Sequence, residues 1–203
     1  MKVVFVILFA IFSISRAEPN CTRNGVSCPD YEVLENFDGY EKRRYPEVTL
    51  VSINGTARER RRIIRRLILR LYRYIGGFNR EHTQIELMVP VRTLKVPGDV
   101  RNGYTISFFL PKEYSSNPPI PLDSKVFLQK EPITDYAVRS FGNFVRNESI
   151  WDKEAETLFG LLPEDEVDTS NYFWAVYDPP VRLRNRLNEV WVRLSPQSQN
   201  LIL

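Results

Sequence analysis

The chain has 203 residues, with 28 Lys and Arg against 25 Asp and Glu, one histidine and two cysteines. A single histidine and the lack of a G-x-S-x-G motif argue against a Ser-His-Asp hydrolase, and no G-x-G-x-x-G or Walker loop is present to bind a nucleotide. One histidine and two cysteines also give no credible zinc site. We therefore expect a protein that is not an enzyme.

The N-terminus predicts secretion. Residues 3–14 are an apolar run, and Ser15-Arg16-Ala17 then places small residues where a signal peptidase requires them. We interpret residues 1–17 as a signal peptide that is removed before Glu18, because the run is too short to cross a bilayer. The mature chain is long enough for one domain with its own core.

Two further features are typical of an extracellular protein. Cys21 and Cys28, in the segment 18–30, are expected to form a disulfide that closes a small loop. Asn20, Asn54 and Asn147 each begin an N-x-Ser/Thr glycosylation motif. Asn54 and Asn147 each precede a predicted helix, so a glycan there would have to point outward.

The net positive charge of the chain comes from one segment, residues 57–75, which contains eight arginines and one acid. Without it the chain would have 20 basic against 24 acidic residues. Thr56 and Glu59 fit a capping box at the start of a helix, and Gly76-Gly77 suit a left-handed cap at its end. The segment has no proline or glycine. It therefore predicts one long helix.

Helical periodicity divides this segment into faces. The core stripe consists of Ile64, Leu67, Leu71, Tyr74 and Ile75. Ile68, Leu69 and Tyr72 lie outside the stripe, on a flank shared with arginines, which would suit a flat apolar ligand with acidic groups. Alternatively, arginine stems simply cover a wide apolar stripe on a surface helix. An outer face holds Arg62, Arg66 and Arg70, for which the sequence gives no role.

The rest of the chain predicts a repeat. Each half has the order β-β-α-β-β, and the proline-rich residues 111–121 connect the halves. The second helix opens at Ser149 and is closed by Pro163. Residues 31–195 form the expected domain and 196–203 a tail. The predicted strands cover residues 31–33, 40–53, 85–91, 104–110, 125–129, 134–140, 172–177 and 189–194.

Several segments, in this order, resemble the SOUL/haem-binding protein family. The most specific are MVPV at residues 88–91, YTISFFLP at 104–111, YDPP at 177–180 and NRLNEVW at 185–191. The resemblance extends over about residues 31–194. It implies an α+β fold, a distorted antiparallel β-barrel of two pseudo-repeated halves with one flanking helix each.

The resemblance also implies non-covalent binding of haem or another tetrapyrrole in an apolar groove beside the first helix. Matched on Gly76-Gly77, the basic positions that would meet the propionates are Arg65 and Arg73, and the apolar contacts are Ile68 and Tyr72. The loop that would close over the ring consists of Tyr177, Asp178, Pro179, Pro180 and Val181.

One position departs from the family pattern. Some members carry a histidine, proposed as an iron ligand, in a Y-E-x-R-H-Y-like segment, where this chain has Arg44. Arginine does not ligate haem iron as histidine does, so we assign no metal ligand. His82 is the single remaining histidine and is expected in a surface loop.

Other partners of the arginine-rich helix fit less well. Nucleic acid is disfavoured because the rest of the chain is acidic and the protein is expected to be secreted. An anionic membrane is disfavoured because the core stripe holds the helix in the domain. A secreted interaction or defence protein, which keeps the fold but uses this helix on acidic or membrane surfaces, remains the alternative.

Overall fold

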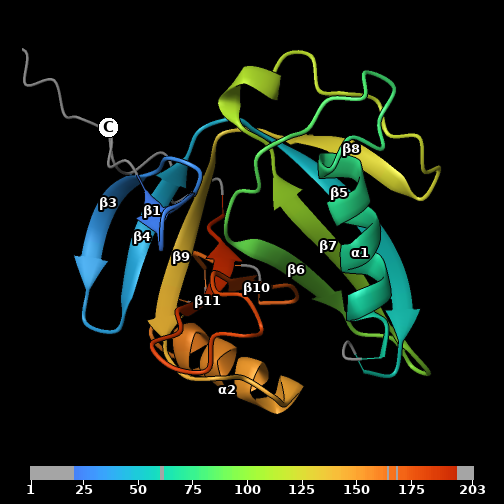
Figure 1. Ribbon diagram of the computed structural model, residues 1–203. Coiled ribbons are helices and arrows are strands. Elements are labelled where there is room, and N and C mark those ends of the chain that lie inside the picture. The colour runs from blue at the N-terminus through green and yellow to red at the C-terminus, as the bar shows by residue number, and fades with distance from the viewer. Residues whose placement is uncertain (1–20, 60–61, 164, 168, 196–203) are drawn as a thin grey trace, which may run out of the picture.

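The computed structural model describes residues 21–59, 62–163, 165–167 and 169–195. In this part of the chain every strand pair is antiparallel, and nine strands form one sheet beside a two-stranded hairpin (Figure 1). The elements are β1 (Thr22–Arg23), β2 (Val26–Ser27), β3 (Glu32–Phe37), β4 (Tyr40–Tyr45), β5 (Val48–Ala57), α1 (Ile64–Ile75), β6 (Val91–Val96), β7 (Asn102–Phe109), β8 (Val126–Glu131), β9 (Thr134–Phe141), α2 (Glu148–Phe159), β10 (Phe173–Val176) and β11 (Asn188–Arg193).

The predicted repeat is confirmed. The run β4-β5-α1-β6-β7 is followed by β8-β9-α2-β10-β11, and the sheet order is β3-β4-β9-β11-β10-β6-β7-β5-β8. The two halves meet where β6 pairs with β10. The first strand of each half also pairs with a strand of the other half, β4 with β9 and β8 with β5.

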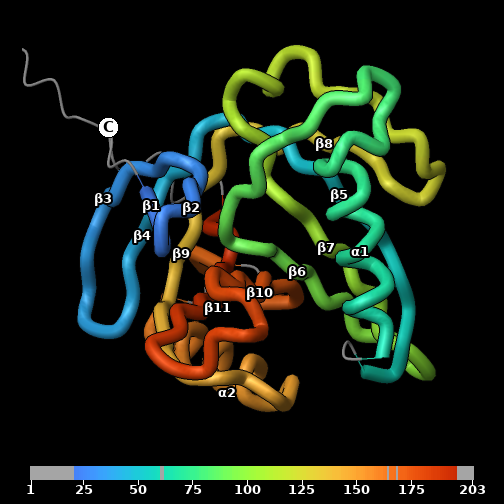
Figure 2. The backbone as a smooth tube through the Cα atoms, viewed as in Figure 1, coloured from blue at the N-terminus to red at the C-terminus, as the bar shows by residue number. Residues whose placement is uncertain are grey.

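The expected α+β fold is therefore present, with a strongly curved sheet. The pairing leaves β3 and β8 as edges, so the described strands do not close into a complete barrel. Both helices lie against the sheet (Figure 2). Their buried residues share one core, which includes Leu71, Trp151 and Trp174. A second core fills the curl of the sheet, where Tyr45 stacks on Trp191 at 4.9 Å between ring centroids.

The helix α1 begins later than predicted. Thr56 and Ala57 are the last residues of β5, so the capping-box interpretation is wrong, and the residue before the helix, Ile63, makes no side-chain cap hydrogen bond. The pairing of β5 with β7 continues to Ala57 opposite Asn102, and these ladder bonds outweigh the local cap signal. Gly55 allows the strand to approach the helix, since a Cβ there would lie 2.8 Å from Leu67.

The end and the core face of α1 are as predicted. Leu67, Leu71, Tyr74 and Ile75 are buried. Gly77 has φ of +101°, which a residue with a side chain rarely adopts. The Phe78 and Gly77 amides donate to the Arg73 and Tyr74 carbonyls, which is the Schellman pattern.

One predicted strand is displaced. Residues 85–91 were expected to be a strand, but β6 starts at Val91 and ends at Val96. Pro90 has no backbone N–H to donate to a ladder, and the Val89 amide instead donates to the Ser27 carbonyl in the N-terminal hairpin. The proline-rich connection predicted between the halves is present, and its Pro119 carbonyl accepts a hydrogen bond from the Tyr74 hydroxyl.

The Cys21–Cys28 disulfide is confirmed and closes the β1–β2 hairpin. Its turn, Asn24-Gly25, has positive φ at both residues, as a tight hairpin of this kind requires. Asn147 is the exposed residue directly before α2. Asn54 is exposed as well, but it lies within β5 and not before a helix, so that expectation is wrong.

The proposed signal peptide, Asn20 and the tail 196–203 lie outside the described residues. Within the described residues, neither helix is long and apolar enough to cross a membrane.

Candidate ligand-binding site

The flank of α1 predicted to hold a ligand is an apolar surface that is partly open. Ile68 is half-buried against the core beneath the helix. Tyr72 is 43% exposed, and its ring stands edge-on to Phe108 of β7 at 5.3 Å between centroids. Leu69 is 53% exposed. Three neighbouring side chains on one helix thus leave apolar surface in contact with water.

Strand register extends this surface across the sheet. Arg92 pairs with Ser107, which brings the preceding Val91 beside Phe108, and Val91 pairs with Val176 of β10. Residues opposite each other share a face, and neighbouring strands lie about 4.8 Å apart. Val176 therefore lies roughly 10 Å from Phe108 on the helix-bearing face. An apolar row runs from α1 to the root of the predicted closing loop.

That loop is held by its first residues. The Tyr177 hydroxyl donates to Glu189 at 2.7 Å in the core inside the curl of the sheet. Asp178 accepts hydrogen bonds from Asn24 at 2.7 Å, Arg23 at 3.2 Å and the Leu187 amide at 2.7 Å. Both side chains thus have structural contacts away from α1, and a ligand contact by either remains a prediction.

The tip of the loop is exposed and apolar. Pro179 and Pro180 are exposed, Val181 is 86% exposed and Leu183 is 70% exposed. The Arg186 guanidinium donates to the carbonyls of Asp178, Pro179 and Arg182 at 2.6–2.7 Å. This one side chain therefore ties down the loop from inside while its apolar tip stays free.

Electrostatics reinforce the root of the loop. Burial would raise the pKa of Asp178, but the hydrogen bond from the Leu187 amide and the positive charge of Arg23 lower it overall. The carboxylate therefore stays ionised at neutral pH. The disulfide hairpin, which carries Arg23, is in this way coupled to the loop.

The predicted basic residues of α1 differ in their surroundings. Arg65 is exposed, and no carboxylate among the described residues forms an ion pair with it. The Arg73 guanidinium lies over the Phe78 ring at 4.3 Å, next to the end of the helix. Arg70, which had no role, binds Asp123 at 2.6 Å and fastens α1 to the segment before β8. Arg65 is thus the basic residue most available to a ligand on the Tyr72 flank.

Comparison with known proteins is decisive for the family. A sequence model of the SOUL heme-binding protein family matches residues 26–193. Human heme-binding protein 2 is 33% identical over 185 residues, which are 87% of this chain and 90% of that protein. Heme-binding protein 1 of Xenopus tropicalis is 26% identical over 156 residues, 75% of this chain and 82% of that protein.

The chain belongs to the SOUL haem-binding protein family. Solved structures with lower identity support the fold alone. The C-terminal domain of EcmrR has a TM-score of 0.59 at 9% identity, covering 81% of this chain and 98% of that one. An uncharacterised conserved protein from Listeria innocua has a TM-score of 0.52 at 13% identity, covering 77% and 92%.

In this SOUL protein the family's histidine position has a structural role. Arg44 of β4 forms two hydrogen bonds of 2.8 Å with Asp135 of β9. Four strands separate β4 from β7 in the sheet order, so Arg44 is far from the Tyr72 flank along the sheet. His82, with φ of +49°, is in the exposed turn after α1, as expected. The described residues contain no cluster that could hold a metal ion.

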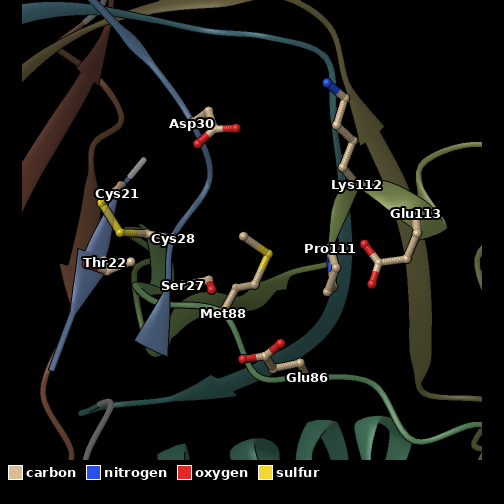
Figure 3. Close-up of a pocket in the computed structure, with 10 residues that line it drawn as sticks. All are labelled: Cys21, Thr22, Ser27, Cys28, Asp30, Glu86, Met88, Pro111, Lys112 and Glu113. Carbon is tan, nitrogen blue, oxygen red and sulfur yellow. A yellow bond between two sulfur atoms is a disulfide. The ribbon is translucent and has the colours of Figure 1, made fainter. Parts of the chain in front are cut away.

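A cavity lined by none of these flank residues lies between the disulfide hairpin and the start of the proline-rich connection (Figure 3). It has a volume of about 420 Å³, and Met88 projects into it between Asp30 and Glu86. Glu113 lines the opposite wall. Three carboxylates against one lysine, Lys112, give the lining a net negative charge, which disfavours the propionates of a tetrapyrrole.

Sequence reasoning missed the floor of the site and the support of its loop. Phe108, Val91 and Val176 come from three strands, and register alone brings them together. Alternation in the YTISFFLP segment could have placed Phe108 on one face with Ile106. Nothing local indicated that Arg186 would hold the loop, because its partners are backbone carbonyls.

Proposed function

We propose that this SOUL protein binds haem or another tetrapyrrole non-covalently on the apolar flank of α1, and that it does so as a secreted binding protein without enzymatic activity. One observation carries the proposal: Ile68, Leu69 and Tyr72 expose apolar surface on one side of α1, in line with a row of apolar residues that leads to the loop 177–181. The names of the relatives, heme-binding proteins 1 and 2, agree with it.

The chemistry of the ligand fits these residues. A porphyrin face is flat and apolar, and covering Tyr72 and Ile68 removes apolar area from water. The porphyrin edge carries carboxylates, which guanidinium groups bind by paired hydrogen bonds. Arg65 provides such a group on the same flank. Arg73 would first have to leave the Phe78 ring, so we expect Arg65 to contribute more.

The loop supplies a second apolar contact. Val181 and Leu183 are exposed, although apolar side chains of this size are usually buried. Because Asp178 and Arg186 fix the ends of the loop, its tip is held near the apolar row without a large ordering cost on binding. We propose that this tip covers the ring.

Iron is not required for this mode of binding. We therefore expect metal-free protoporphyrin IX to bind with an affinity within a few-fold of that of haem, measured by quenching of tryptophan fluorescence. An affinity for haem more than about 100-fold higher would show that an iron ligand contributes several kcal/mol and that our assignment is incomplete.

The test of the site is a haem titration followed by Soret absorbance. Replacing Arg65 and Arg73 by glutamate should weaken binding by roughly 100-fold, since each loses a charge-assisted hydrogen bond and gains a repulsion. The matched control is Arg62→Glu with Arg66→Glu, which makes the same charge change at the start of α1 and in the turn before it. Equal affinity in the Arg65/Arg73 variant would refute the site.

Secretion is the second part of the proposal and has its own test. Mass spectrometry of protein collected from the medium of expressing eukaryotic cells should show an N-terminus at Glu18 and glycans on Asn54 or Asn147, whose side chains are exposed. A full-length chain retained in the cells would contradict it.

A further inference from the structure

A second cavity lies where α1 begins, and it is lined by arginines. Its volume is about 440 Å³, within the range of small-ligand sites. Four guanidinium side chains line it, those of Arg58, Arg62, Arg66 and Arg101, together with Thr56, Ala57 and Ile63. All four arginines are exposed.

Three separate segments build this arginine cavity. Arg58 follows the end of β5, Arg62 and Arg66 belong to the start of α1 and its lead-in, and Arg101 lies in the connection from β6 to β7. The Asn102 side chain donates to the Arg58 carbonyl at 3.4 Å and accepts from the Gly98 amide at 3.3 Å. One side chain thus links two of the segments, so the convergence of the arginines is part of the fold.

Among the described residues, these arginines have no acidic partners, unlike several other arginines of the chain. Arg44, Arg70, Arg92 and Arg139 each bind a carboxylate within 3 Å. No carboxylate among the described residues lies within 4.0 Å of a guanidinium nitrogen of the four cavity arginines. Four like charges around one cavity repel each other and create a strong positive potential. An anion would relieve that repulsion.

We propose that the arginine cavity binds a small ligand with at least two tetrahedral oxyanion groups, phosphate or sulfate. Guanidinium groups bind such oxygens through paired hydrogen bonds, and several in one place match a multiply charged ligand better than a single carboxylate. This site is distinct from the proposed tetrapyrrole flank of Ile68, Leu69 and Tyr72, because none of these three residues lines the cavity. It gives Arg62 and Arg66 a role.

The lining separates this ligand from larger anionic partners. None of the described residues that line the cavity is aromatic, so unpaired bases would find no ring to stack on. Its two apolar side chains, Ala57 and Ile63, are 6% and 7% exposed and cannot insert into a bilayer. Val100, beside Arg101, is 71% exposed, so anionic vesicles belong in the test.

The experiment is isothermal titration calorimetry of the mature protein with two probes, inorganic pyrophosphate and a disulfated heparin disaccharide. We expect saturable binding of one probe per chain, weakening steeply as salt rises. Binding of pyrophosphate alone identifies a phosphate ligand, and binding of the disaccharide alone identifies a sulfated glycan. Binding of both shows that the cavity reads the shared oxyanion chemistry.

Two variants separate a built site from a general positive field. Arg62→Glu with Arg66→Glu should weaken binding by roughly 100-fold or more. Arg62→Lys with Arg66→Lys keeps the charge but loses the paired hydrogen bonds, and should weaken it by roughly 10-fold. Arg101→Glu, on an exposed turn, gives an independent loss if the α1 variant unfolds. Circular dichroism monitors the fold of each.

Several results would overturn the proposal. The first is that neither probe binds at millimolar concentration. The second is that the Arg62/Arg66 and Arg101 glutamate variants bind the probes as tightly as the parent protein. Binding of anionic vesicles or single-stranded DNA, with no affinity for either small probe, would show that this end of the molecule is a broad contact surface and not a small-ligand site.

Discussion

The two helices occupy equivalent places in the repeat but make different contacts. In α2, Trp151 is 4% exposed and stacks on Trp174 of β10 at 5.5 Å between ring centroids. Acidic residues of α2 pair with basic residues of the sheet, as Glu154 does with Arg139. In α1, Tyr72 is 43% exposed at the sheet surface, and Arg62 and Arg66 have no acidic partner among the described residues. Both helices contribute to the core, but α1 also exposes an apolar flank and arginines without an acidic partner among the described residues.

This difference shows how a repeated fold can divide its tasks. Both helices bury one stripe in the same core, which the fold requires. Apolar and charged side chains of α2 find partners within the protein, whereas those on the exposed side of α1 are accessible to ligands. Substitutions in α2 should therefore lower the stability of the fold the most, and substitutions in α1 should weaken ligand binding the most.

The largest expected loss of stability is at Trp151. Trp151→Ala should lower the free energy of unfolding by about 3–5 kcal/mol, because it removes a buried indole and leaves a cavity against Trp174. Tyr72→Ala is the matched change on α1 and should cost no more than about 1 kcal/mol while weakening haem binding. Urea denaturation and a haem titration measure the two effects. Similar losses of stability would contradict the division between the helices.

A buried ion cluster joins the two halves and gives the next largest effect. Glu131 of β8 accepts hydrogen bonds from Arg92 of β6 at 2.6 and 2.9 Å, from Arg193 at 2.9 Å and from the Tyr136 hydroxyl. Glu131→Gln should cost about 3 kcal/mol, because it leaves the Arg92 charge buried without its partner. Thermal unfolding at pH 7 measures this loss, and a change below about 1 kcal/mol would refute the role of the cluster.

The same cluster predicts a pH dependence. Burial would raise the pKa of Glu131, but the hydrogen bonds and charge of Arg92 outweigh it and lower the pKa to about 2. A lowered carboxyl pKa stabilises the fold above the unfolded pKa of about 4.5, and this contribution is lost as the pH falls toward 2. It amounts to roughly 3 kcal/mol. In Glu131→Gln, the fall in stability between pH 5 and 2 should be smaller by that amount.

A smaller loss of stability is expected at Asp178, in the loop 177–181 that follows β10. Asp178→Asn removes the charge that binds Arg23 and the Leu187 amide, and should cost about 1–2 kcal/mol. Haem should bind more weakly and hydrogen exchange at residues 178–187 should accelerate, while α1 is unchanged. A loss of stability without faster exchange in the loop would show that Asp178 does not control it.

Sequence predicted the features that are local or repeated. Hydrophobic spacing placed Leu67, Leu71, Tyr74 and Ile75 in the core, and Gly77 marked the end of the helix. The start of α1 failed because Thr56 and Ala57 are paired with a strand 47 and 45 residues away, at Gly103 and Asn102. A local cap signal carries no information about such a partner.

The candidate site could be predicted only in part. The resemblance and the periodicity indicated Ile68, Arg65 and Tyr72, all on one helix. The floor of the site depends on the register of three strands, and the loop is held by Arg23 from a hairpin 155 residues away. The arginine cavity likewise needs Arg101, which no pattern within residues 57–75 could bring beside Arg62.

The most direct test of the two faces of α1 is a crossed titration of two double variants with two ligands. Haem binding should fall in the Arg65/Arg73 glutamate variant and persist in the Arg62/Arg66 glutamate variant. Binding of whichever oxyanion probe the parent protein takes up should show the reverse. If both variants lose both ligands equally, the helix contributes only its total charge, and the division of α1 into two sites is wrong.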